Sequence, residues 1–168
     1  SFLYGAGIYF GQHSDAILDS SEISNNGETN IGFGGGIYIH SNTDVTFDGV
    51  LIKNNKASFG GGIYLPAKLG NANPVFRRVE IISNEAIHGG GIYVGGKSTG
   101  LLKMYNSKVT NNIATGYGGG FYINRSTNKI ELYDILITGN SAVTKGGGIY
   151  VLEANPRIER SLFEGNAS

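Results

Sequence analysis

The chain has 168 residues, and its 13 lysines and arginines are balanced by 13 aspartates and glutamates. This balance gives no support to nucleic acid as a partner, because proteins that bind a polyanion carry a basic excess. The absence of cysteine excludes disulfides and thiolate metal sites, and no stretch reaches the ~18 apolar residues of a membrane-spanning helix.

A glycine-rich segment opens the chain and returns along its whole length. It reads GAGIY at residues 5–9, GGGIY at 34–38, 60–64, 89–93 and 146–150, and GGGFY at 118–122. The closing tyrosines are therefore 26 to 29 residues apart. A fixed period of this size indicates stacked repeats, in which each unit buries its apolar face against its neighbours.

A second motif follows in each repeat and is centred on an asparagine. Apolar residues stand three and eight positions before it, as Ile52 and Phe47 stand before Asn55. Polar residues alternate with these apolar ones at a period of two, which is typical of β-strands. Residues 1–168 are therefore predicted to form one all-β segment, a right-handed parallel β-helix of about six coils with three short strands per coil.

Inward-facing asparagines at the same corner of successive coils can donate and accept hydrogen bonds along their own column. We therefore predict a structural asparagine ladder. Its members are Asn26, Asn55, Asn84, Asn112, Asn140 and Asn166. The same register places Ile37, Ile63, Ile92, Phe121 and Ile149 in the core, with the tyrosine after each of them pointing outward and exposed on at least one face.

The glycine segment and the asparagine motif together resemble the repeats of the chlamydial polymorphic outer membrane proteins. That family has a GGAI-type segment and an FxxN motif, and the second stands here as FEGN at residues 163–166. In the other repeats isoleucine or valine replaces the phenylalanine. The resemblance implies a right-handed parallel β-helix in an extracellular or cell-surface protein that serves in adhesion.

Residues 91–98, GIYVGGKS, match the P-loop pattern letter for letter. A P-loop lies between a strand and a helix, whereas here the glycine segment is predicted to be a strand that leads into another strand. We therefore expect no nucleotide site and no cofactor.

Two pairs of aspartates recur at equal positions of the first two repeats, Asp15 with Asp44 and Asp19 with Asp48. Stacked carboxylates about 5 Å apart can hold Ca²⁺ or act as an acid and base pair. Outward charges on a solenoid are more often solvated, and Arg77 continues the second column, where it can neutralise Asp48. The aspartates are thus weak metal candidates, and we expect no catalytic residue.

The remaining charged residues predict ion pairs between coils and not along strands. Lys56 shares a column with Glu85, Glu80 shares one with Lys108, and a third column is formed by Lys103, Glu131 and Arg157. The histidines, His13, His40 and His88, fall at different phases of the repeat, so no nucleophilic triad is indicated.

The tyrosines of the glycine segments form an outward column, which we call the tyrosine column. Its members are Tyr9, Tyr38, Tyr64, Tyr93, Tyr122 and Tyr150. Exposed rings can stack on pyranose rings or contact a partner chain, which makes a glycan or another surface protein a candidate partner. We favour a structural role instead, because a ring lying across glycine backbone shields it.

Glycosylation sequons begin at Asn124 and Asn166, the second of them within the predicted ladder. The leading hypothesis is a non-enzymatic extracellular or cell-surface β-helix with a structural or adhesive role. The alternative is a carbohydrate-active or carbohydrate-binding β-helix that uses the aspartates or the tyrosine column. Because no polar cap precedes the first repeat or follows the last, we expect further repeats, or copies of the chain stacked end to end, to cover both.

Overall fold

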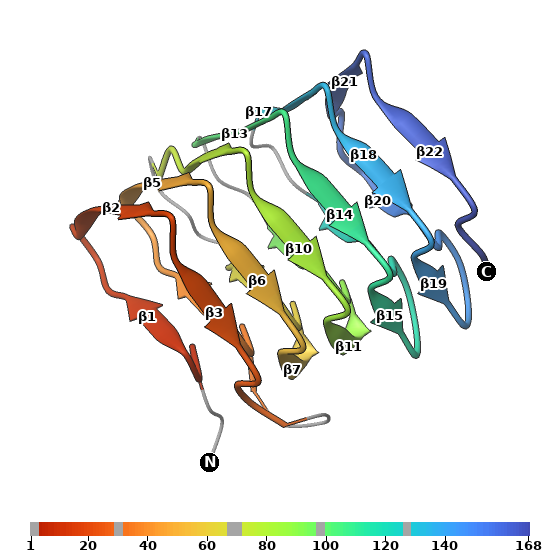
Figure 1. Ribbon diagram of the computed structural model, residues 1–168, viewed down its shortest axis with the longest axis horizontal. Coiled ribbons are helices and arrows are strands. Elements are labelled where there is room, and N and C mark those ends of the chain that lie inside the picture. The colour runs from red at the N-terminus through yellow and green to blue at the C-terminus, as the bar shows by residue number, and fades with distance from the viewer. Residues whose placement is uncertain (1–3, 29–31, 67–71, 97–99, 126–128) are drawn as a thin grey trace.

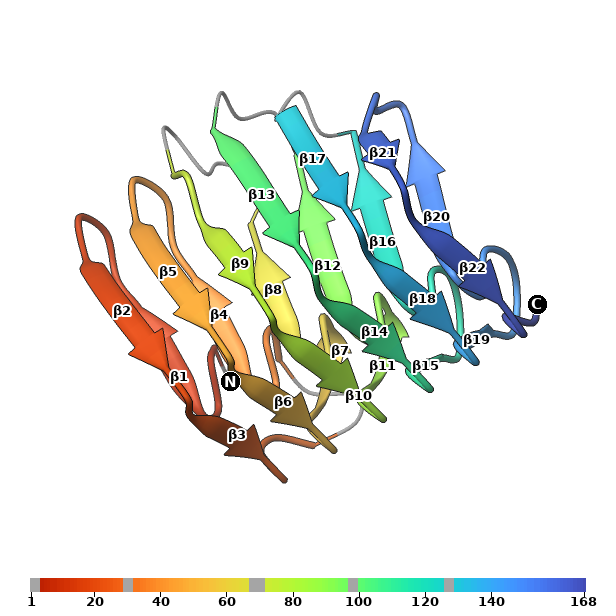
Figure 2. The same cartoon turned by 45° about the horizontal axis from the view of Figure 1, so that its top comes forward.

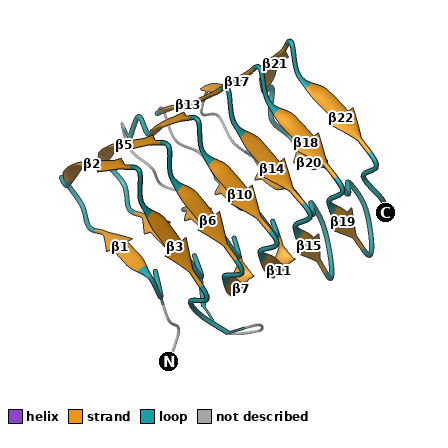
Figure 3. Ribbon diagram, in the orientation of Figure 1, coloured by secondary structure: helices purple, strands orange, loops and turns teal. Residues whose placement is uncertain are grey.

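A computed structural model describes residues 4–28, 32–66, 72–96, 100–125 and 129–168. All the regular structure within these ranges is β-strand, as the uniform strand colour of Figure 3 shows. The chain winds as a solenoid whose successive coils lie side by side (Figures 1 and 2). No helix in the described ranges is long and apolar enough to cross a bilayer.

Each coil contributes strands to three six-stranded parallel sheets. The glycine sheet contains β1 (Ile8–Phe10), β4 (Ile37–Ile39), β8 (Ile63–Leu65), β12 (Ile92–Gly95), β16 (Phe121–Asn124) and β20 (Ile149–Leu152). The middle sheet contains β2 (Asp15–Asp19), β5 (Asp44–Asp48), β9 (Val75–Arg77), β13 (Leu101–Tyr105), β17 (Lys129–Tyr133) and β21 (Arg157–Glu159). The asparagine sheet contains β3 (Glu22–Ser24), β6 (Leu51–Lys53), β10 (Glu80–Ile82), β14 (Lys108–Thr110), β18 (Leu136–Thr138) and β22 (Leu162–Glu164).

A fourth sheet joins the asparagine corner to the next glycine segment. Its strands are β7 (Lys56–Phe59), β11 (Glu85–His88), β15 (Ile113–Ala114) and β19 (Ser141–Ala142). The predicted all-β parallel solenoid with three main strands per coil is confirmed, and this short sheet adds to it. The chain makes five full turns between β1 and β20, the first and sixth strands of the glycine sheet.

Like residues stack in register through the core. Ile37, Ile63, Ile92 and Phe121 are neighbours in the glycine sheet and are fully buried, as predicted. Ile149, their neighbour in the sixth coil, is partly buried. In the middle sheet, the rings of Phe47 and Phe76 stack face to face with centroids 4.8 Å apart. Each coil thus covers the apolar interior of the one before it.

The glycine triplets are required by close backbone contacts. The first glycine of each triplet has a positive φ, such as +63° at Gly60, which L side chains adopt only at a cost. A Cβ on the third glycine, Gly62, would lie 2.6 Å from the carbonyl oxygen of Gly91 in the next coil. The triplets therefore form a seam along which successive coils approach closely, and each triplet leads into a strand of the glycine sheet.

Ion pairs join successive coils on the outside. Lys56 Nζ lies 2.9 Å from a carboxylate oxygen of Glu85, and Lys108 Nζ lies 2.7 Å from one of Glu80, as predicted. Arg157 departs from the expectation, because it pairs with Glu159 two residues along its own strand although Glu131 is its neighbour in the sheet. Residues two apart share one face of a strand, so a long guanidinium can reach along the strand as well as across it.

The seam generates a first testable prediction. Gly62→Ala should destabilise the fold by about 1–3 kcal/mol, because the new methyl group must push two backbones apart. Urea unfolding measures this loss. The matched control is Gly11→Ala, where the nearest atom to a new Cβ is 3.6 Å away; it should be neutral or slightly stabilising. Equal unfolding midpoints for the two variants would contradict the account of the seam.

Candidate functional site

The six predicted ladder asparagines lie in one column at the corner that follows the asparagine sheet. In the first five coils, the backbone N–H and the side-chain Nδ2 of the asparagine both donate to Oδ1 of the asparagine one coil later. For Asn84 these donors lie 2.9 and 3.0 Å from Asn112 Oδ1. The second Nδ2 hydrogen bond runs backwards, from Asn84 to the carbonyl oxygen of Ile52 at 3.0 Å.

The inner asparagines are fully buried, yet their hydrogen-bonding capacity is filled. Asn55, Asn84, Asn112 and Asn140 are each 0% exposed. The two donors and the two acceptor sites of each amide are all used, which removes the cost of burying a polar group. A hydrocarbon at this corner would leave the neighbouring amides and carbonyls without partners.

The ladder and the glycine seam depend on each other. The amide of each asparagine lies against the third glycine of its own coil, so that a Cβ on Gly91 would be 3.1 Å from Asn112 Nδ2. That distance is shorter than normal van der Waals contact. Both repeated motifs of the sequence therefore serve one packing arrangement inside the solenoid.

The tyrosine column points outward, but most of its rings are covered. Consecutive rings have centroids 5.0 to 5.3 Å apart along the whole column. Tyr38, Tyr93 and Tyr122 are only 6 to 8% exposed, whereas Tyr9 in the first coil is 49% exposed. The expectation that all these tyrosines are exposed is wrong, although the register that turns them outward is right.

A second aromatic column, which we call the corner column, provides the cover. It stacks Tyr4, Phe33, Phe59, His88 and Tyr117, with neighbouring centroids 5.3 to 5.5 Å apart. Each of these rings also contacts the tyrosine of the following coil. The sequence analysis missed this column, although its signal is present: an aromatic residue precedes the glycine segment in each of the first five repeats.

The stacking decides what the tyrosine column can bind. A pyranose binds to the face of an aromatic ring, and here the faces are occupied by neighbouring rings. Burial, followed by the nearby Tyr9 and Tyr4, raises the pKa of Tyr38 to about 12. Burial also raises the pKa of Tyr93 and Tyr122. The phenols are therefore neutral near pH 7, and the column is mainly a packing element.

The aspartate pairs lie on the outer face of the middle sheet. Asp15 is the register neighbour of Asp44, and Asp19 is that of Asp48. Asp44 accepts hydrogen bonds from the backbone N–H and Nδ2 of Asn73, at 2.9 and 3.2 Å. In the part of the chain that the structure describes, no group of three histidines, cysteines or acids is placed to hold a metal ion.

The partner of Asp48 differs from the expected one. Arg78, and not Arg77, lies 2.6 Å from a carboxylate oxygen of Asp48. Arg77 instead lies over the ring of Tyr105, whose other face stacks on Tyr133 at 5.5 Å. Because arginine side chains are long, the position of a residue in a column does not by itself predict which group its guanidinium contacts.

The remaining sequence motifs are part of the solenoid. The P-loop match begins at Gly91, directly before β12, and runs through that strand, while its Lys97 and Ser98 lie outside the described residues. Both sequon asparagines use their amides within the fold. Asn124 Nδ2 donates to the hydroxyl of Tyr93 at 3.1 Å, and Asn166 Nδ2 donates to the Ile137 carbonyl at 2.7 Å. His13 and His40 lie in the first two coils, whereas His88 belongs to the corner column.

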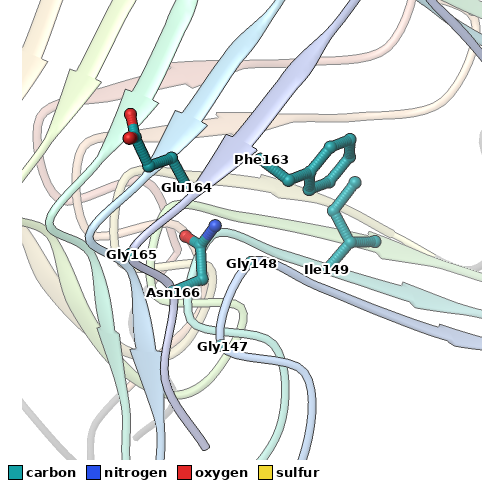
Figure 4. A pocket seen from close by; sticks show the side chains of 7 residues that line it. All are labelled: Gly147, Gly148, Ile149, Phe163, Glu164, Gly165 and Asn166. Carbon is teal, nitrogen blue, oxygen red and sulfur yellow. The ribbon is translucent and has the colours of Figure 1, made fainter.

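A hollow lies on the outer face of the sixth coil, between the glycine segment and the last asparagine corner (Figure 4). Gly147, Gly148 and Ile149 line one side, and residues 163–166 line the other. Figure 4 shows the side chains of Phe163 and Ile149 next to each other and Asn166 near Gly148. These are the core and ladder positions of the repeat, and no convergent set of titratable groups lines the hollow.

The stacked parallel sheets, the buried amide ladder and the glycine seam define a parallel β-helix protein. The chain belongs to the family described as the right handed beta helix region, whose model matches residues 2–132. Residues 134–152 match the Chlamydia polymorphic membrane protein repeat, which confirms the resemblance seen in the motifs. None of the curated proteins and none of the solved structures matches the chain.

The ladder generates a second testable prediction. Asn112→Asp should cost about 3 kcal/mol or more of unfolding free energy, because a carboxylate cannot donate to Asn140 Oδ1 or to the Ile81 carbonyl. Chemical denaturation measures the loss. The control is Asn111→Asp at the exposed preceding residue, which should stay within about 0.5 kcal/mol of the parent. A similar small effect at both positions would refute the role assigned to the ladder.

Proposed function

We propose that this chain is a non-catalytic β-helix segment of a cell-surface or secreted protein, where it acts as a rigid structural or adhesive shaft. The observation that carries the proposal is the asparagine ladder. The recurring polar side chains of the repeat are turned inward and bind one another, so they serve the stack and not a substrate.

The match to the Chlamydia polymorphic membrane protein repeat supports the surface location, because that family is named for membrane proteins. It covers residues 134–152, a single repeat containing one ladder asparagine and one glycine segment. The other coils have the same two motifs in the same places. A surface role suggested for this repeat therefore extends naturally to the whole stack.

The outer faces support a non-catalytic role. β-Helix enzymes that act on polysaccharides need acid and base groups converging on one sugar, with carboxyl groups set about 5–10 Å apart around it. Here Asp48 forms an ion pair with Arg78, and Asp44 accepts a hydrogen bond from the backbone N–H of Asn73. The aromatic rings that would have to stack on sugar present their edges.

Catalysis can be tested directly. We expect the wild-type chain to release no product from a panel of neutral and acidic polysaccharides, with or without Ca²⁺, as followed by reducing ends and by absorbance of unsaturated sugars. The matched variant combines Asp15→Asn with Asp48→Asn. Turnover by the wild type that this variant loses would overturn the proposal in favour of a carbohydrate-active enzyme.

Antibody labelling of intact source cells tests the proposed surface location. A signal that appears only after lysis would contradict that location.

We further propose that the partners of the end coils are coils of the same repeat. The ladder is directional: each asparagine donates through N and Nδ2 to Oδ1 of the next. A coil set against the sixth would offer its Oδ1 to Asn166, and a coil set against the first would donate to Asn26 Oδ1. Phe163, 46% exposed on the outer face of the sixth coil, would be covered at the same time.

This partner proposal predicts that the 168-residue chain associates end to end in a concentration-dependent way. Phe163→Arg should weaken the association at least several-fold, because it places a charge where an apolar neighbour would pack. Ile113→Arg is the control, since Ile113 is 48% exposed on the side of the solenoid. Sedimentation velocity measures both. A monomer at all concentrations would contradict the partner proposal while leaving the structural role intact.

A further inference from the structure

His88 is the histidine of the corner column, whose other members are tyrosines and phenylalanines. It lies at the end of β11, with its ring between those of Phe59 and Tyr117 at centroid distances of 5.5 and 5.3 Å. The same ring covers Tyr122 of the next coil at 5.5 Å, with an interplanar angle of 29°. One imidazole therefore holds two aromatic columns together over the fourth and fifth coils.

The imidazole also replaces a backbone acceptor. The N–H of Tyr117 donates to His88 Nδ1 at 3.2 Å, whereas the two preceding amides of that coil, Thr115 and Gly116, donate to backbone carbonyls. Because Nδ1 accepts, the neutral ring carries its proton on Nε2. A protonated ring has N–H groups at both nitrogens and would set a donor against the Tyr117 N–H.

Space around the ring is limited on the side of the fifth coil. A Cβ on Gly116 would lie 2.5 Å from His88 Cε1 and 2.7 Å from Nδ1. Gly116 is buried, and its amide donates to the carbonyl oxygen of Ile87, the residue before His88. Little free space is therefore left beside the ring on this side of the corner.

Among the residues that the structure describes, no carboxylate contacts this ring to compensate a charge on it. On the neighbouring elements, Glu85 of β11 is paired with Lys56 of β7, and Lys145 follows Tyr117 in the same row. The other groups facing His88 are the phenols of Tyr117 and Tyr122. Burial lowers the pKa of His88 below its ordinary value of 6.5, and no charged neighbour adds to that shift.

We propose that protonation of His88 opens the aromatic corner of the fourth and fifth coils and uncovers Tyr122, which gives this face of the β-helix an acid-triggered aromatic surface. The proton comes from solvent. The charged ring loses its hydrogen bond to Tyr117 and leaves the column, while the buried asparagine ladder, which packs against the third glycines of the seam, stays closed. Cation–π attraction from the flanking rings, worth about 0.5–2 kcal/mol, opposes the opening but does not replace the lost acceptor.

The direction with pH follows from the lowered pKa. The open corner binds a proton more readily than the closed corner, so closure is favoured above pH ~6.5. It weakens as pH falls from there toward the lower pKa of the closed form, and the opening constant rises by at most about tenfold per pH unit. The change is reversible and separate from acid unfolding, which requires the carboxylates to be protonated at lower pH.

NMR provides the test on the intact chain. The His88 ring signals should titrate below pH ~6.5, and amide exchange at Tyr117, corrected for intrinsic chemistry, should speed up over the same range. Amides of Ile81 and Val109 in the asparagine sheet serve as internal controls and should not change. A Tyr117 exchange rate that does not respond to the ionisation of His88 would overturn the proposal.

Two substitutions separate the ring from its proton. His88→Asn offers a neutral acceptor that cannot titrate, and His88→Phe fits the column as Phe33 and Phe59 do but accepts no hydrogen bond. Both should abolish the pH dependence of Tyr117 exchange, and His88→Phe should raise that exchange several-fold at every pH. If the pH dependence persists in His88→Asn, another group causes it and the assignment to His88 is wrong.

Discussion

Self-stacking is the constraint on which the rest of this structure depends. In a parallel coil, every side chain lies about 4.8 Å from the side chain at the same position of the next coil. A residue type persists along a column only if it attracts its own kind. Asparagine does so because its amide both donates and accepts, aromatic rings do so by stacking, and aliphatic chains do so by excluding water. A carboxylate repels its copy, which is why the aspartate columns give way to other residues after two coils.

The inside of the solenoid could be predicted from the sequence because each buried column consists of residues of one chemical type, either apolar residues or asparagine. The core positions represented by Ile63 and Ile92 and the ladder positions represented by Asn55 and Asn84 recur at a constant offset. A period of two within a period of about 28 then fixes which side chains face inward. Nothing about the surface is needed for that inference.

The outside was less predictable, because exposure depends on neighbours in other columns. Tyr93 faces outward as its register requires, yet Phe59 of the previous coil covers it. That cover is harder to see in the sequence because the corner column mixes tyrosine, phenylalanine and histidine. The ion pairs of Arg78 with Asp48 and of Arg157 with Glu159 likewise depend on how far each long side chain extends, and not on its column position. Long flexible side chains carry too little positional information for a sequence pattern to assign their contacts.

The direction of the amide ladder has a genetic consequence. Every interface between coils presents donors on one side and an acceptor on the other, in the same sense throughout. An in-frame duplication or deletion of one whole unit joins a donor side to an acceptor side again, so the gene can lengthen or shorten without new interactions having to evolve. An insertion or deletion that is not a whole number of units would shift the register and place ladder asparagines beside hydrocarbon side chains. Recombination between units is therefore tolerated where their boundaries coincide, and the repeat number becomes a trait that selection can adjust independently of the fold.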